Sequence, residues 1–289
     1  MLSEVNRFKV HPYADQKAVL TSKHQKLGQI RPAFADLIGL HVVEMDLDTD
    51  RLGTFTGEIK RLNPPRETAI LKARMGLDAS GSSLGIASEG SIGPDPLIPF
   101  AISDIEHVVL VDDERNIVIS ETFRSFEITV ATVSVNRGED ISGFLLQAGF
   151  PLHKLIVRPQ TPVSNYCVKG IGNITQLRKA IEECSEYSPQ GLVTIESDLR
   201  AHCSPTRQLN ISRAALALAL RVNQLCPYCN SPGWGGVTHK KGVKCGECLR
   251  LNSEAISQEI LSCVCCDYKE DGLVIAQSLD PRYCTWCNP

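Results

Sequence analysis

Cysteines in the last quarter of the chain are the residues whose types and spacing most clearly indicate chemistry. None of the twelve cysteines precedes Cys167, and eight of them form four Cys-x-x-Cys pairs after residue 225. The pairs are Cys226/Cys229, Cys245/Cys248, Cys263/Cys266 and Cys284/Cys287. A Cys-x-x-Cys turn directs two thiolates at one metal ion, and two such turns complete a tetrahedron around Zn²⁺. We therefore predict two structural zinc ions, each held by four cysteines.

The order of the pairs along the chain favours metal sites built from neighbouring pairs. Fifteen residues separate the first pair from the second, and seventeen separate the third from the fourth, as in zinc ribbons. This predicts one site from Cys226 to Cys248 and another from Cys263 to Cys287. Four sulfur ligands leave no open position for a substrate, so both sites are expected to be structural. An iron–sulfur cluster is the chemical alternative. Cys265, inside the third pair, is expected to be a spare cysteine that could compete with Cys263 or Cys266 for the metal.

The composition is that of a globular protein with a sizeable core. The 289 residues include 43% apolar and 22% charged residues, with a net charge of −3. The longest apolar run, 214–220, is too short to span a bilayer. The charged N-terminal segment does not resemble a secretory signal, and the clustered cysteines favour metal binding in a reducing compartment over disulfides. We expect a cytoplasmic protein that does not enter membranes.

The pattern of apolar residues predicts three units along the chain. Residues 1–162 alternate strand and helix and predict an α/β domain with a mixed sheet. Residues 163–225 predict a linking block of helix, strand, loop and helix, in which Thr175 and Asn210 are candidate helix caps. Residues 226–289 form the predicted double zinc ribbon. In the first unit we expect strands at 18–20, 40–45, 83–87, 107–112, 116–120, 126–135 and 154–157, and helices at 30–38, 63–76 and 139–148.

A polar turn after the first predicted strand is suited to phosphate binding. Ser22, His24 and Lys26 lie in this turn, directly before a helix. Such a turn binds phosphate through backbone N–H groups, a hydroxyl and an ammonium. Further along, a predicted helix carries Lys72, and a strand-end loop places Glu89 among small residues. These segments predict an anion site at the edge of the sheet.

Three segments carry a resemblance to a known enzyme family. They read Thr-Ser-Lys-His-Gln-Lys at 21–26, Glu-Thr-Ala-Ile-Leu-Lys-Ala-Arg at 67–74 and Gly-Ile-Ala-Ser-Glu-Gly-Ser-Ile at 85–92. Their order resembles the house-cleaning inosine/xanthosine triphosphate pyrophosphatases, which have a phosphate turn, a helix with a lysine and an acidic strand-end loop. The resemblance covers about a third of the chain and implies an inosine-triphosphatase-like fold for the first domain.

The resemblance also implies roles for individual residues. It implies phosphate contacts for Ser22, His24, which stands where the family has Asn, and Lys26, assisted by Lys72. Glu89 would hold Mg²⁺ or activate water, with Glu58 or Glu67 as a second carboxylate. The implied function is Mg²⁺-dependent hydrolysis of a nucleoside triphosphate or related phosphate.

The chain as a whole resembles a bacterial protein family that has a C-terminal double zinc ribbon and no assigned reaction. The similar segments are 48–58, 87–94, 197–207 and the closing Tyr-Cys-Thr-Trp-Cys-Asn-Pro. Within 197–207, Arg200, His202 and Arg207 surround Asp198 and form a candidate anion site, because guanidinium groups match phosphate geometry. A buried ion-pair network that ties this block to the main sheet is the alternative.

Two non-enzymatic functions remain open from the sequence. One is a ligand- or protein-binding adaptor, and the other is a zinc-ribbon protein that associates with nucleic acid. Residues 226–250 carry a net charge of +3 and residues 251–289 a net charge of −4. Because phosphate-backbone binding needs a sustained basic face, this balance disfavours nucleic acid as a partner.

Overall fold

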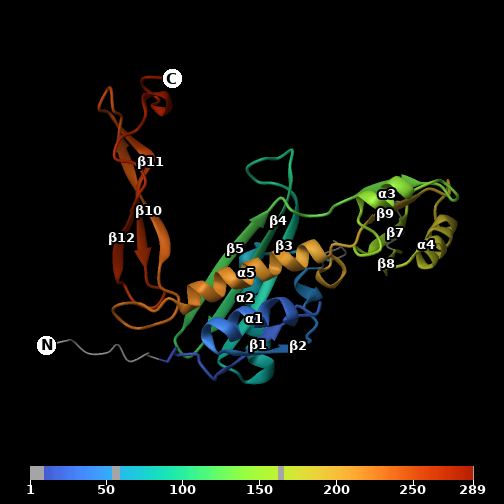
Figure 1. The fold of residues 1–289 in the computed structure, drawn as a ribbon, viewed down its shortest axis with the longest axis horizontal. Helices are drawn as coiled ribbons and strands as arrows, with labels where there is room; N and C mark the ends of the chain where they lie inside the picture. The colour runs from blue at the N-terminus through green and yellow to red at the C-terminus, as the bar shows by residue number, and fades with distance from the viewer. Residues whose placement is uncertain (1–9, 54–58, 162–165, 289) are drawn as a thin grey trace.

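The computed structural model describes residues 10–53, 59–161 and 166–288, and Glu58 lies outside them. Three parts follow one another in Figure 1: a sheet lobe in the middle, a second lobe on one side and the cysteine-rich tail on the other. Within the described residues, no helix is both long and apolar enough to cross a membrane.

A five-stranded mixed sheet forms the centre of the sheet lobe, in the order β2-β1-β3-β4-β5. Strands β1, β2 and β3 run parallel, whereas β4 and β5 are antiparallel to their neighbours. The mixed sheet predicted from the sequence is confirmed. The strands are β1 (Lys17–Thr21), β2 (His41–Met45), β3 (Leu84–Pro94), β4 (Ile102–Asp112) and β5 (Ile117–Ser125).

Helices cover both faces of this sheet. Helices α1 (Leu27–Ile38) and α5 (Pro205–Asn223) bury Phe34 and Leu218 against one face, together with Ile86 of β3. Helix α2 (Pro65–Ser80) buries alanines and a leucine against the other face, where it meets Ala87. Because successive strand residues point to opposite faces, β3 contributes to both cores.

The second lobe has its own four-stranded sheet, in the order β6-β9-β7-β8, with a separate core. Cys184 is buried in this core. The sheet extends across residue 162, so this lobe differs from the predicted division into 1–162 and 163–225. Its elements are β6 (Thr132–Val135), α3 (Ser142–Gln147), β7 (Leu155–Pro159), β8 (Val168–Ile171), α4 (Ile174–Glu186) and β9 (Val193–Ser197).

Two predicted helix caps are wrong. The side chain of Asn173, not Thr175, caps α4 by accepting a hydrogen bond from the backbone of Gln176. Helix α5 begins at Pro205, so Asn210 lies inside it. The Asn210 amide instead donates to Asp104 of β4, a long-range partner that a local capping rule does not consider.

The tail contains a long three-stranded antiparallel sheet in the order β10-β11-β12. Its strands are β10 (Gly236–Lys244), β11 (Leu251–Ser262) and β12 (Lys269–Val274). Arg221 of α5 donates hydrogen bonds to the carbonyl oxygens of Gly233 and Gly235, and these contacts attach the base of the tail to the sheet lobe.

Candidate functional site

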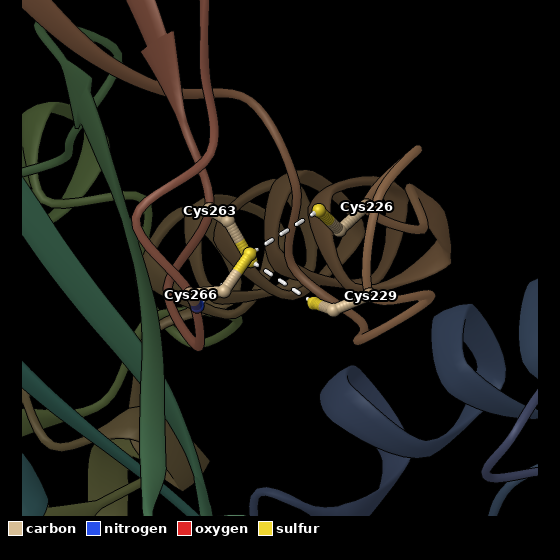
Figure 2. Close-up of side chains that lie close together, drawn as sticks. All are labelled: Cys226, Cys229, Cys263 and Cys266. Carbon is tan, nitrogen blue, oxygen red and sulfur yellow. Dashed lines mark hydrogen bonds between the residues drawn. The ribbon is translucent and has the colours of Figure 1, made fainter.

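Eight cysteines of the tail gather into two groups of four. Cys226 and Cys229 meet Cys263 and Cys266 at the base of the tail, as Figure 2 shows. The second group lies at the far end and consists of Cys245, Cys248, Cys284 and Cys287. Within each group all ligand sulfurs lie within 4.8 Å of one another.

The spacing of the sulfurs fits zinc. Within the first group, the Sγ–Sγ distances between its two cysteine turns are 3.9 and 3.7 Å. In the second group they are 3.8 and 3.7 Å. A tetrahedron with Zn–S bonds of about 2.3 Å has sulfurs roughly 3.8 Å apart. Disulfide sulfurs would be about 2 Å apart. The two groups could therefore each hold a zinc ion. Each such ion would link two cysteine turns that are far apart in the sequence of the tail.

The predicted pairing of the cysteine turns is wrong, although the structure groups the same eight residues. The first turn is grouped with the third and the second with the fourth, so the two sites interleave along the chain. The reason is the nine-residue strand β10, which lies between Cys229 and Cys245. At about 3.3 Å per residue it separates these turns by roughly 30 Å. The antiparallel strand β11 then returns the chain to Cys263.

The predicted phosphate residues lie where the direction of the chain connections changes. Helix α1 follows β1 on one face of the sheet, whereas α2 precedes β3 on the opposite face. Such a switch point leaves a crevice at the carboxyl ends of the two strands, where open α/β sheets bind ligands. Ser22 and Lys26 follow β1, and Ser88 and Glu89 lie on β3 beyond its pairing with β1.

Lys26 is a buried cation at this switch point. Only 7% of the residue is exposed, and its Nζ donates to the Oγ of Ser88 at 2.8 Å. Burial lowers the pKa of Lys26 to about 8, the carboxylate of Glu106 opposes this, and Arg207 and Lys72 lower it further. A buried ammonium with one hydroxyl partner is suited to an anionic ligand.

Glu89 holds two cations. Its Oε1 lies 2.8 Å from a terminal nitrogen of Arg61 in an ion pair, and its Oε2 accepts a hydrogen bond from Lys72 at 2.5 Å. Burial alone would raise the pKa of Glu89, but Lys72, Lys26 and Arg61 outweigh it and lower the pKa. Arg61 was missed by sequence reasoning because it lies in a loop without a motif. The carboxylate therefore positions cations on the α2 side of the switch point.

The remaining predicted residues of this region are placed differently. Ser22 is buried, and its Oγ accepts a hydrogen bond from the backbone of His24 at 3.3 Å, so it shapes the turn. Glu67 is exposed in the first turn of α2, where its carboxylate lies 3.7 Å from Arg66. The ion-pair partner of Glu67 is thus its own neighbour, whereas the partners of Glu89 are Arg61 and Lys72.

The three residues of the candidate anion site at 197–207 have different partners. Arg200 forms a two-pronged pair with Asp198. Arg207 is paired with a different acid: it donates to Glu106 of β4 at 2.6 Å and also to the carbonyl of Leu199 at 2.7 Å. The ion-pair network is thus what the structure shows for these two arginines. His202 instead contacts His24, with ring centroids 5.4 Å apart.

A pair of buried acids was missed by sequence reasoning. Asp104 and Glu106 are fully buried on the same face of β4, opposite Asn210 and Arg207 of α5. Burial raises the pKa of Asp104 to about 7, and the neighbouring Glu106 raises it too. Acids at alternating positions, 104 and 106, directly before the apolar run 108–111 were the available signal.

A comparison with protein families finds one family model that covers most of the chain. The model of a domain of unknown function, DUF6671, matches residues 72–289. The chain belongs to the DUF6671 family. No curated protein matches the chain. The DUF6671 match includes Lys72, Glu89 and all eight grouped cysteines, whereas the turn at 22–26 precedes it.

Proposed function

We propose that this DUF6671 protein binds a phosphate-bearing small molecule at the switch point between β1 and β3. The observation that carries the proposal is the convergence of two lysines from separate elements on adjacent residues of β3. Lys26, directly before α1, donates to Ser88, and Lys72 of α2 donates to Glu89. Nucleotides are the ligand class that the resemblance of the three segments implies.

The surroundings of the lysines support an anionic ligand. Lys26, Lys72, Arg61 and Arg207 bring four cationic groups to this region, and the carboxylate of Glu89 holds Lys72 and Arg61 in place. Ammonium and guanidinium groups bind phosphate oxygens through charge-assisted hydrogen bonds. The start of α1 adds backbone N–H groups, which favour negative charge through the helix dipole.

Magnesium does not fit the carboxylates of this arrangement. Mg²⁺ requires oxygen ligands in near-octahedral geometry, usually one or two free carboxylates with phosphate oxygens. Both oxygens of Glu89 form ion pairs with cations, and Glu67 is exposed beside Arg66. The geometry supports binding better than Mg²⁺-dependent hydrolysis, which stays a prediction from the resemblance.

Lys26→Ala is expected to weaken binding of inorganic triphosphate about 10- to 100-fold. The estimate corresponds to one charged hydrogen bond of about 1.5–3 kcal/mol. Isothermal titration calorimetry of the full-length, zinc-loaded protein measures the affinity. Lys23→Ala is the matched control, because Lys23 lies three residues away and pairs with Asp48 on the surface. Equal affinity of the wild type and Lys26→Ala, or no binding by the wild type, contradicts the proposal.

A panel of nucleoside triphosphates, with and without Mg²⁺, separates a binder from an enzyme. We expect binding without release of phosphate or pyrophosphate. Turnover by the wild type that disappears in Glu89→Gln would instead establish the hydrolase, with Glu89 as a catalytic residue. The melting temperature of each variant shows whether the fold is retained.

A further inference from the structure

His24 and His202 meet beside the proposed phosphate site. His24 lies in the turn between β1 and α1, and His202 lies in a short 3₁₀ helix, η2 (Ala201–Cys203), which precedes α5. Their ring centroids are 5.4 Å apart with an interplanar angle of 37°. The Nδ1 of His202 is buried without a hydrogen-bond partner among the described residues. The contact between the two rings connects the turn at 22–26 to the segment that returns from the second lobe.

Cations outnumber available acids around both rings. His24 faces Lys26, Arg207 and His202, with Asp50 as the acid that acts on it. Asp50 is already paired with Lys23.

The surroundings of His202 repeat this pattern. Arg200 and Lys154 are the cations that act on it, and Asp198 is the acid. Asp198 is already held by Arg200. Burial, followed by these cations, lowers the pKa of both histidines, that of His24 to about 4. Both imidazoles are therefore neutral near pH 7.

We propose that a phosphate or other tetrahedral dianion bound at the switch point draws a proton onto the His24–His202 pair. The inference rests on the proposed function and adds His24 and His202 to the same site as side chains that take up a proton when the anion binds. A dianion beside a buried imidazole favours its charged form, since it supplies the negative charge that the surrounding ion pairs do not. By reciprocity, protonation of the pair strengthens binding of the dianion.

The coupling also narrows the class of ligand. A terminal phosphate carries close to two negative charges near neutral pH and gains most from an added imidazolium. A phosphodiester carries only one negative charge and gains less. The favoured ligand is therefore a molecule with a terminal phosphate. If the pKa of one histidine rises by about one unit on binding, the affinity for an anion of fixed double charge rises as pH falls, by at most about tenfold.

Carbon-13 NMR of labelled histidines tests the coupling directly. The titration midpoints of His24 and His202 are measured in the full-length, zinc-loaded protein, with and without saturating sulfate, which stays a dianion over this range. The resonances are assigned with His24→Gln and His202→Gln. At least one of the two midpoints is expected to rise by about one pH unit or more with sulfate, and Lys26→Ala should remove the rise. His41, an exposed residue at the start of β2, is the internal control and should not shift.

The possible results separate the two proposals. If sulfate changes the amide signals of residues 22–26 to saturation while the histidine midpoints stay unchanged, the proton coupling is overturned. The proposed anion site is then retained. Absence of any binding of sulfate and of inorganic triphosphate between pH 5 and pH 8 overturns both proposals.

Discussion

The double variant Cys226→Ser/Cys263→Ser is expected to retain one tightly bound zinc ion, whereas Cys226→Ser/Cys245→Ser is expected to retain none tightly. In the interleaved arrangement the first variant removes two ligands from one site and leaves the other site complete. The second variant removes one ligand from each site, so that both keep only three thiolates. Structural zinc contributes roughly 10 kcal/mol or more to the folding of small zinc domains, so an intact four-sulfur site should resist a chelator.

Metal analysis after dialysis against a moderate chelator distinguishes the pairings. Sites built from neighbouring pairs would give the reverse result, with one tight ion in Cys226→Ser/Cys245→Ser and none in the other variant. Cys265→Ser is the matched control, because Cys265 is exposed and lies outside both groups; it should retain two ions. A third strongly bound ion, or a requirement for Cys265, would contradict the proposed ligand set.

Asp104→Asn is expected to change the pH dependence of stability by about 2–4 kcal/mol between pH 4 and pH 8. The pKa of Asp104 is raised to about 7 in the folded protein, above its value in the unfolded chain. Between these values the folded state binds more protons than the unfolded state, so the contribution of Asp104 to the free energy of unfolding falls as pH rises. The contribution of Asp104 to the free energy of unfolding is greatest below the pKa that its carboxyl has in the unfolded chain. It is lost once the pH exceeds the pKa of the same carboxyl in the folded protein.

Asparagine keeps the shape of Asp104 and cannot ionise. The variant should therefore gain stability relative to the wild type as pH rises, because the wild type must then place a second carboxylate beside Glu106. Urea unfolding at several pH values measures the difference. Asp15→Asn is the control, since the Asp15 side chain is 94% exposed and its removal should leave the profile nearly parallel to the wild type. A constant difference between Asp104→Asn and the wild type would show that Asp104 does not carry the extra proton.

The zinc ligands illustrate what sequence spacing determines and what it leaves open. Each Cys-x-x-Cys turn is a local structure, so the eight ligands can be recognised from the sequence alone. Which turns share an ion depends on how far the intervening residues extend. Residues 236–244 form an extended strand instead of a compact loop, and this long-range outcome decides the pairing.

The polar residues of the sheet lobe show the same limit. Lys26, Lys72 and Glu89 were predicted to form one anion site because they lie in a turn after a strand, on a helix and in a strand-end loop. Glu89 lies inside β3, which is longer than predicted. Arg207 was grouped with its neighbours in sequence, but its carboxylate partner Glu106 lies 101 residues away. Partners across α5 and β4 depend on the packing of a helix whose start, predicted after Asn210, lies six residues earlier at Pro205.

A crystal structure of the zinc-loaded protein with a non-hydrolysable nucleoside triphosphate most directly tests the central claim that the switch point is a phosphate site. We expect phosphate density at the carboxyl ends of β1 and β3, within hydrogen-bond distance of the Nζ atoms of Lys26 and Lys72. A well-ordered nucleotide bound elsewhere, with Lys26 still donating only to Ser88, would contradict the account.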